Sequence, residues 1–221
     1  MATVPITHFS DVLCVWAYIN QIRTRELQAQ FQDEIEFDFR YFNVFGDVLS
    51  KMETNWGERG GLEAYAEHVQ EVASGFSHVT LHKNVWRQNI PVSSMPAHLL
   101  VAAARLHDKE QLSNVAPGLD VAIREAFFGA AVDVSSFQAL FTIATDQALD
   151  LDAIKGELDS GRAHALVAQD LKTAADLGIR SSPTLTFNAG RQTLSGNVSY
   201  RILEANIREL TRFTGDQQSW C

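Results

Sequence analysis

Hydrophobic and polar residues near the start of the chain predict a strand, a helix and a second strand. Residues 6–9 form a short apolar run that ends at a serine and an aspartate, which is typical of a buried strand. From residue 14 to about residue 31, apolar residues recur mainly at helical spacing. Residues 35–41 alternate apolar and charged side chains, which is the period of a half-buried strand. A right-handed crossover would make the two strands parallel.

The middle of the chain is first interrupted by glycines and then becomes helical. Residues 46–61 are predicted to be irregular, because three glycines fall within the last five positions. Residues 62–72 have a helical pattern, and residues 97–176 are predicted to be helical almost throughout.

The chain then returns to β-structure. Residues 184–187 predict a strand, residues 188–190 a turn, and residues 191–195 a second strand. Residues 199–212 predict an amphipathic helix. The polar residues 215–221 are expected to form a loose tail.

The order of these elements predicts an α/β fold: a βαβ…ββα platform that carries a large all-helical insertion. We assign the platform to residues 1–56 and 172–214, the helical insertion to residues 57–171, and a flexible tail to residues 215–221. No linker is long enough to separate two independent domains.

Composition and charge narrow the range of functions. The chain has 221 residues, of which 46% are hydrophobic, so it can bury a sizeable core. It carries 18 basic and 27 acidic side chains, for a net charge of -9, and this acidity argues against nucleic acid as a partner. No apolar run approaches the roughly 20 residues that cross a membrane. The N-terminus does not resemble a signal peptide, so we expect a cytoplasmic protein.

The two cysteines, Cys14 and Cys221, are too few for a disulfide framework. Cys14 falls where the first strand ends and the first helix begins. Free N–H groups and the helix dipole favour a thiolate there, and such cysteines have pKa values lowered from about 8.5 to about 3.5–7.5. The alternative is a small apolar residue buried under the helix.

A second feature is Ser182-Pro183, which comes directly before a predicted strand. Some X-Pro bonds at such positions are cis, and a cis bond would turn the backbone of Ser182 toward an extended substrate. A trans proline at the start of a strand is the alternative.

The two motifs together resemble the DsbA-like branch of the thioredoxin superfamily. They are SDVLCVWAY at residues 10–18 and GIRSSPT at residues 178–184, and Ala97-His98 resembles a further element of its cytoplasmic members. Those members include FrnE-like oxidoreductases, 2-hydroxychromene-2-carboxylate isomerases and kappa-class glutathione transferases. The resemblance covers roughly residues 4–212 and implies a thioredoxin-like fold with a helical insertion. It also implies that the Ser182–Pro183 bond is cis and lies beside Cys14.

One position departs from the family pattern. The oxidoreductases carry Cys-X-X-Cys, whereas this chain has Cys14-Val15-Trp16-Ala17. Without a thiol at Ala17, Cys14 can form a mixed disulfide but cannot release it by the usual intramolecular attack. A monothiol mechanism with glutathione stays open.

The resemblance implies glutathione as a co-substrate. Cys14 would be the catalytic nucleophile, and Trp16, Ser182 and Pro183 would position the substrate thiol. The relatives hold the γ-glutamyl end of glutathione at the start of the last helix, where Asn197 and Ser199 fall in this chain. The kappa transferases dimerise, so a homodimer is possible.

Several tryptophans and histidines are further candidates for a substrate cleft or a metal site. Trp16, Trp56 and Trp86 could line an apolar cleft or pack in the core. The spacing of His78 and His82 suits a metal pair on a helix. Without a third ligand we expect no metal site.

Three further residues lie near the motifs or at the end of the chain. His8 could approach Cys14 or face the core. Asp11 is expected to cap or turn the chain. Cys221 could be a distant resolving thiol or an exposed cysteine on the tail.

Three functions follow from these features. The first is a thiol-disulfide oxidoreductase that uses Cys14 alone, with glutathione. The second is a glutathione-dependent isomerase or transferase that acts on an aromatic small molecule. The third is a non-catalytic DsbA-like protein that binds a protein or peptide along the proline loop, and Ala17 supports it.

Overall fold

The computed structural model describes residues 3–212. Four strands and nine α-helices follow one another along this part of the chain. Their order is β1 (Val4–Ser10), α1 (Val15–Phe31), β2 (Ile35–Tyr41), α2 (Val48–Trp56), α3 (Gly61–Ser74), α4 (Met95–Gln111), α5 (Ala116–Ala130), α6 (Phe137–Asp146), α7 (Leu151–Asp159), α8 (Arg162–Asp176), β3 (Thr184–Phe187), β4 (Gln192–Ser195) and α9 (Tyr200–Arg212).

The four strands form one sheet in the order β2-β1-β3-β4. β1 and β2 are parallel, with Ile6 opposite Phe37, which confirms the predicted crossover. β3 runs antiparallel to β1, and β4 runs antiparallel to β3. The start of β3 therefore lies beside the end of β1, and this arrangement brings the two sequence motifs to one end of the sheet.

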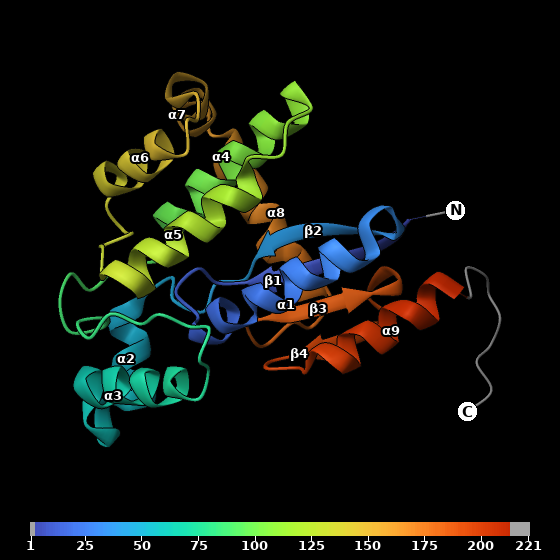
Figure 1. The fold of residues 1–221 in the computed structure, drawn as a ribbon. Coiled ribbons are helices and arrows are strands. Elements are labelled where there is room, and N and C mark those ends of the chain that lie inside the picture. Colours follow the sequence, from blue (N-terminus) through green and yellow to red (C-terminus); the bar gives the residue numbers. More distant parts are fainter. Residues whose placement is uncertain (1–2, 213–221) are drawn as a thin grey trace.

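Helices cover both faces of the sheet (Figure 1). Leu27 and Phe31 of α1 and Leu203 and Ile207 of α9 share one buried cluster with residues of β1, β2 and β3. On the other face, Phe9 of β1 packs with residues of α8 and the segment after it. The predicted α/β platform with a helical insertion is confirmed.

The insertion lies between β2 and β3 in the sequence and contains helices α2 to α8. α4 is at its centre and packs against α5, α7 and α8. Eight consecutive residues of α4, residues 97–104, are buried. Small alanines make up half of this run, and they allow the neighbouring helices to approach closely. The insertion packs against the start of α1 in one large hydrophobic cluster.

One segment differs from the sequence prediction. Residues 46–61 were expected to be irregular, but α2 occupies Val48–Trp56. The Asp47 carboxylate caps this helix by accepting a hydrogen bond from the Ser50 N–H. The glycines lie after the helix rather than inside it, and Gly60 has a left-handed backbone with φ of 100°.

The boundaries proposed for the insertion stay predictions. α2 already precedes residue 57, and α8 spans the second boundary at residues 171 and 172. The expected loose tail and Cys221 lie outside the described residues. In the part of the chain that the structure describes, none of the helices has the length and apolar character needed to cross a membrane.

Candidate functional site

Cys14 lies at the junction predicted from the sequence. β1 ends at Ser10, and α1 begins at Val15, so Cys14 is the residue directly before the helix. Its backbone is extended, and its carbonyl oxygen accepts the first helical hydrogen bond from Tyr18 N–H at 3.1 Å. The residue is only 7% exposed. The thiol therefore sits at a helix start but is largely shielded from water.

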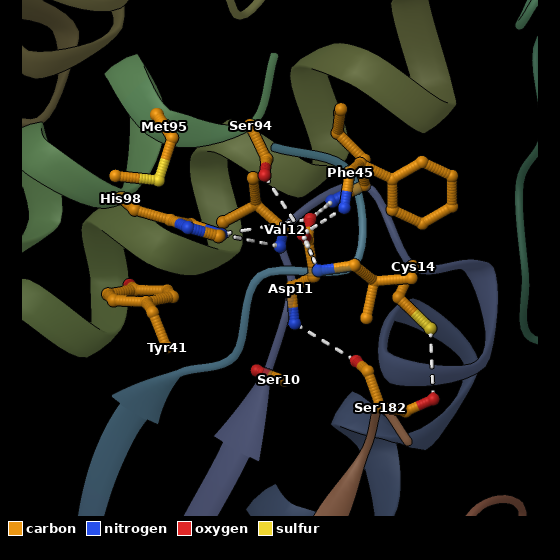
Figure 2. Close-up of polar contacts among 12 residues, drawn as sticks. Ser10, Asp11, Val12, Cys14, Tyr41, Phe45, Ser94, Met95, His98 and Ser182 are labelled. Carbon is orange, nitrogen blue, oxygen red and sulfur yellow. Dashed lines mark hydrogen bonds and ion pairs between the residues drawn. The ribbon is translucent and has the colours of Figure 1, made fainter. Parts of the chain in front are cut away.

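The proline loop lies directly against Cys14. The Ser182–Pro183 peptide bond is cis in the structure. Cys14 Sγ donates a hydrogen bond to the Ser182 carbonyl oxygen at 3.1 Å, and the Asp11 N–H donates to Ser182 Oγ at 2.9 Å (Figure 2). These two contacts hold the loops together across more than 160 residues of sequence. The expected juxtaposition of Cys14 and Ser182 is confirmed.

Burial raises the pKa of the Cys14 thiol. Hydrogen bonding with Ser182 and with the backbone N–H of Ala17 acts in the opposite direction, the latter as expected at a helix start, but neither outweighs the loss of water. The prediction of a lowered pKa is therefore wrong for this structure. Its physical reason is that a thiolate needs solvation, and one helix end does not replace it here. The group is a protonated thiol at neutral pH.

Ala17 occupies the place where a second thiol would stand. It is 2% exposed and lies one helical turn after Cys14. No other cysteine belongs to residues 3–212, and Cys14 is free and buried. Within this part of the chain, Cys14 has no cysteine with which to form an intramolecular disulfide.

Cys14 borders a pocket of about 300 Å³ between the platform and the insertion. Two of the three tryptophans considered for a cleft, Trp16 and Trp56, line this pocket. Trp86 does not, because it is fully buried in the core. The complete lining is Cys14, Val15, Trp16, Val44, Phe45, Lys51, Trp56, Tyr65, His68, Arg180, Ser181 and Ser182.

A buried carboxylate supports the loop before Cys14. Asp11 is fully buried, and its Oδ1 accepts from the Leu13 N–H at 2.9 Å. Its Oδ2 accepts from the N–H groups of Val44 and Phe45 at 2.9 and 2.8 Å and from Ser94 Oγ at 2.9 Å. Figure 2 shows these contacts converging on one side chain. The predicted turn role of Asp11 is confirmed, and the carboxylate also reaches the insertion.

His98 of α4 lies beside this carboxylate. Its Nε2 accepts a hydrogen bond from the Val12 N–H at 3.3 Å and lies 3.7 Å from Asp11 Oδ1. Its Nδ1 has no hydrogen-bond partner. Burial lowers the pKa of His98. The ring is therefore neutral at neutral pH and acts as an acceptor for the loop.

Arg124 of α5 is the cation of this buried cluster, and sequence reasoning missed it. Its guanidinium donates to the Asp11 carbonyl at 3.2 Å, to Ser10 Oγ at 2.9 Å and to the Asp120 carboxylate at 3.0 Å. The side chain is 2% exposed. A charged residue on the apolar face of a helix, between Ile123 and Phe127, was the available signal.

The two residues expected to hold glutathione lie elsewhere. Asn197 accepts a hydrogen bond from the Arg23 guanidinium, which also donates to the Val198 carbonyl at 3.0 Å. Ser199 precedes α9, and its carbonyl oxygen accepts from the Ile202 N–H at 3.1 Å. Neither residue lines the Cys14 pocket. The structure brings together Cys14, Trp16 and Ser182, but it does not add Asn197 and Ser199 to them.

The three other histidines singled out from the sequence have local partners or lie in the core. His78 Nε2 lies 3.1 Å from the Ile19 carbonyl, and His82 Nδ1 accepts from the Asn84 N–H at 3.2 Å. His8 is buried, with its ring against Phe39. Across residues 3–212, no group of three or more histidine, cysteine, aspartate or glutamate side chains could hold a metal ion.

A family model described as Thioredoxin matches residues 8–204. The chain belongs to the thioredoxin family. Within that family it is DsbA-like, since the helical insertion interrupts the platform between β2 and β3.

Solved structures share this fold. A putative protein disulfide isomerase from Nitrosomonas europaea has a TM-score of 0.79 and 15% identity, covering 97% of this chain and 100% of that one. The cytosolic disulfide reductase DsbM from Pseudomonas aeruginosa, solved with GSH, has a TM-score of 0.68 and 17% identity, covering 92% of this chain and 99% of that one.

Sequence comparison also finds ClpXP adapter proteins. The adapter SpxH of Bacillus licheniformis is 37% identical over 93 residues, which are 40% of this chain and 31% of SpxH. SpxH of Bacillus subtilis is 29% identical over 152 residues, which are 66% of this chain and 49% of SpxH. The matches therefore span about a third and about half of the length of these relatives.

Proposed function

We propose that this thioredoxin-family protein is a binding module that holds a segment of a partner protein at the Cys14 pocket. The observation that carries this proposal is the state of the thiol. Cys14 is buried, and its thiol donates a hydrogen bond to the Ser182 carbonyl. Burial raises the pKa of this thiol. Ala17, three residues later, stands in place of a resolving cysteine. The site has a pocket beside Cys14 and Ser182 but lacks a dithiol.

The similarity to SpxH supports a role in binding. Those relatives are ClpXP adapter proteins by name. An adapter needs a surface that recognises another protein, and it needs no turnover at a thiol. We therefore propose an adapter-type role in the cytoplasm, with the Cys14 pocket, including Trp16 and Ser182, as the recognition surface. Pro183 is buried and does not line the pocket, but its cis bond orients the Ser182 carbonyl beside Cys14.

A peptide-display selection on the immobilised protein tests the proposal. Selected peptides, made without cysteine, are measured against Trp16→Ala, which removes one wall of the pocket. Ile202→Ala is the matched control, because Ile202 is 54% exposed on α9 and outside the pocket. We expect Trp16→Ala to weaken binding about tenfold, whereas Ile202→Ala and Cys14→Ser leave it unchanged.

Two results would contradict the proposal. Steady reduction of insulin disulfides or exchange with glutathione disulfide that Cys14→Ser abolishes would show an enzyme and overturn the binding proposal. Peptides that bind the wild type and Trp16→Ala with equal affinity would place recognition elsewhere on the molecule.

A monothiol exchange with glutathione is the second candidate function. The pocket beside Cys14 favours it, as does the similar fold of DsbM solved with GSH. Cys14 as thiolate would attack the glutathionyl sulfur of a disulfide between glutathione and another thiol, forming a mixed disulfide with glutathione and releasing the other thiol as thiolate. A glutathione thiolate would then attack the glutathionyl sulfur of this mixed disulfide, because Ala17 offers no thiol for that step. This second attack releases Cys14 as thiolate and forms glutathione disulfide.

Mass spectrometry of the Cys221→Ser protein after treatment with glutathione disulfide tests this candidate. One glutathionyl adduct on Cys14, removed by reduced glutathione at a rate above that of a small thiol, would support it. If the protein is instead a glutathione-dependent isomerase or transferase, Cys14→Ser keeps substantial activity. An unmodified Cys14 after prolonged treatment counts against exchange.

A further inference from the structure

The rim of the Cys14 pocket is cationic in an otherwise acidic protein. Its lining includes the two basic side chains Lys51 and Arg180, together with His68, but no aspartate or glutamate. The whole chain carries nine more acidic than basic side chains. By contrast, the groove along β2 is lined by several carboxylates, among them Glu36, Asp38 and Asp108. The pocket therefore lacks the acidic side chains that outnumber the basic ones in the chain as a whole.

The rim cations lack partners within the described part of the chain. None of its ion pairs includes Lys51, His68 or Arg180. The Lys51 ammonium lies 4.9 Å from the centre of the Phe45 ring instead. His68 and Arg180 are exposed. The charges of Lys51 and Arg180 are therefore available to groups that approach the pocket from outside, and the His68 ring is available as a hydrogen-bonding group.

The walls between these cations are aromatic. Trp16 and Trp56 line the pocket and are half-buried, and the Trp56 ring lies 5.2 Å from that of Tyr65. Phe45 completes this wall beneath Lys51. Aromatic surfaces of this kind bury an apolar side chain of a partner, and such anchors carry much of the energy of an interface.

The size of the pocket limits what it can hold. A volume of about 300 Å³ is at the lower end of the range for small-molecule sites. It accommodates an anchoring side chain, while the flanking residues of a peptide lie over the rim. Lys51 comes from α2, His68 from α3 and Arg180 from the segment before β3, so three separate elements contribute these side chains to the pocket.

We propose that the partner segment is acidic and carries an aromatic anchor residue, which the pocket takes while Lys51, His68 and Arg180 contact the flanking carboxylates. This proposal rests on the proposed binding function and names the chemistry of the partner. Complementary charge steers encounter and fixes orientation more than it adds affinity, so the aromatic anchor supplies the affinity and the rim supplies selectivity.

Fluorescence anisotropy with three short labelled peptides tests the proposal. The first peptide has glutamates flanking one phenylalanine, the second replaces the glutamates by lysines, and the third replaces the phenylalanine by alanine. The pocket variant is Lys51→Glu with Arg180→Glu. Its matched control is Lys155→Glu with Arg201→Glu, which makes the same charge change at two exposed positions outside the pocket. Circular dichroism and urea unfolding confirm that both variants fold.

We expect the first peptide to bind the wild type and the control alike, and the pocket variant about tenfold more weakly. The alanine peptide binds weakly to all three proteins. The lysine peptide binds weakly to the wild type and the control, but more tightly to the pocket variant, where its charges meet glutamates. Raising the NaCl concentration from about 0.05 to about 0.5 M weakens binding of the first peptide to the wild type, because salt screens exposed charges.

Several results overturn the inference. If the glutamate and lysine peptides bind the wild type with equal affinity, the rim does not select charge. If the control variant loses as much affinity for the first peptide as the pocket variant does, the effect is one of overall charge. Absence of binding by all three peptides also rejects an acidic aromatic segment as the partner. If displayed peptides with neutral or basic sequences still depend on Trp16, the binding function stands and only the acidic partner is rejected.

Discussion

The buried carboxylate of Asp11 accepts a hydrogen bond from the hydroxyl of Ser94 at 2.9 Å. Asp11 follows β1 in the platform, and Ser94 is the residue before α4 in the insertion. The same carboxylate oxygen also accepts the N–H groups of Val44 and Phe45. One side chain therefore joins three segments beneath the Cys14 loop, and the geometry of the loop depends on it.

Asp11→Asn is expected to destabilise the protein by about 3 kcal/mol. The substitution turns an acceptor into an NH₂ donor among buried donors and removes the negative charge that balances them. Urea unfolding followed by circular dichroism measures the change. Asp47→Asn is the control, because the exposed Asp47 caps only α2, and we expect a loss below about 1 kcal/mol. A similar small loss for both variants would contradict the structural role of Asp11.

His8→Leu should make the protein less sensitive to acid. His8 is buried, neither ring nitrogen has a partner, and its pKa is lowered to about 4, mainly by burial and also by the charge of Arg124. The unfolded chain takes up this proton near pH 6.5, whereas the folded chain does so only near pH 4. The free energy of unfolding therefore falls as pH falls through this window. His8 accounts for a loss on the order of 3 kcal/mol between pH 6.5 and pH 4.

Unfolding in urea at about pH 7.5 and about pH 4.5 measures this dependence. His8→Leu should reduce the difference in unfolding free energy between the two pH values. His164→Leu, which removes an exposed histidine on α8, should leave it nearly unchanged. A wild-type pH dependence in the His8→Leu protein would show that this histidine is not held neutral.

Alkylation of Cys14 by iodoacetamide should be slow at neutral pH and keep rising above about pH 8.5, the midpoint of an ordinary thiol. Burial raises the pKa of this thiol, and only the thiolate reacts. The Cys221→Ser protein makes Cys14 the reporting cysteine. The same protein in denaturant is the control, and there the rate should level off near the ordinary pKa. A folded-state rate that levels off below about pH 7 would indicate an activated thiol.

Ala17→Cys should restore a dithiol site. Residues three apart lie on the same side of a helix start, so the new thiol and Cys14 can form a disulfide. We expect the variant to lose two hydrogen atoms on oxidation, two protons and two electrons, and to gain insulin-reducing activity, both measured in the Cys221→Ser background. Val15→Cys is the control, since adjacent residues do not face each other on a helix. A variant that folds but forms no disulfide would contradict this geometry.

The local pattern of hydrophobic and polar residues was sufficient to predict the strands and helices of the platform. The alternation from Ile35 to Tyr41 predicted β2 with its bounds, and the helical spacing after Cys14 predicted α1. Both signals depend on which side of one element faces the core, and neighbouring residues record this directly. The pattern failed at α2, where a cap at Asp47 outweighs the glycines that follow.

The site was only partly predictable, because its components come from distant parts of the chain. Cys14 and Ser182 were found through two motifs, but Arg124, Ser94 and His98 reach the loop only in the folded structure. The direction of the Cys14 pKa was missed for the same reason. A helix start is visible in sequence, whereas the burial that outweighs it depends on residues from the insertion and the proline loop.

The long separation between Cys14 and Ser182 also has a consequence for biosynthesis. A ribosome makes the thiol early, whereas the carbonyl group that it contacts is added 168 residues later. Until that point the thiol is solvated and has the reactivity of an ordinary cysteine. Oxidants and electrophiles therefore meet Cys14 most readily on the nascent chain, and completion of the fold is what protects it.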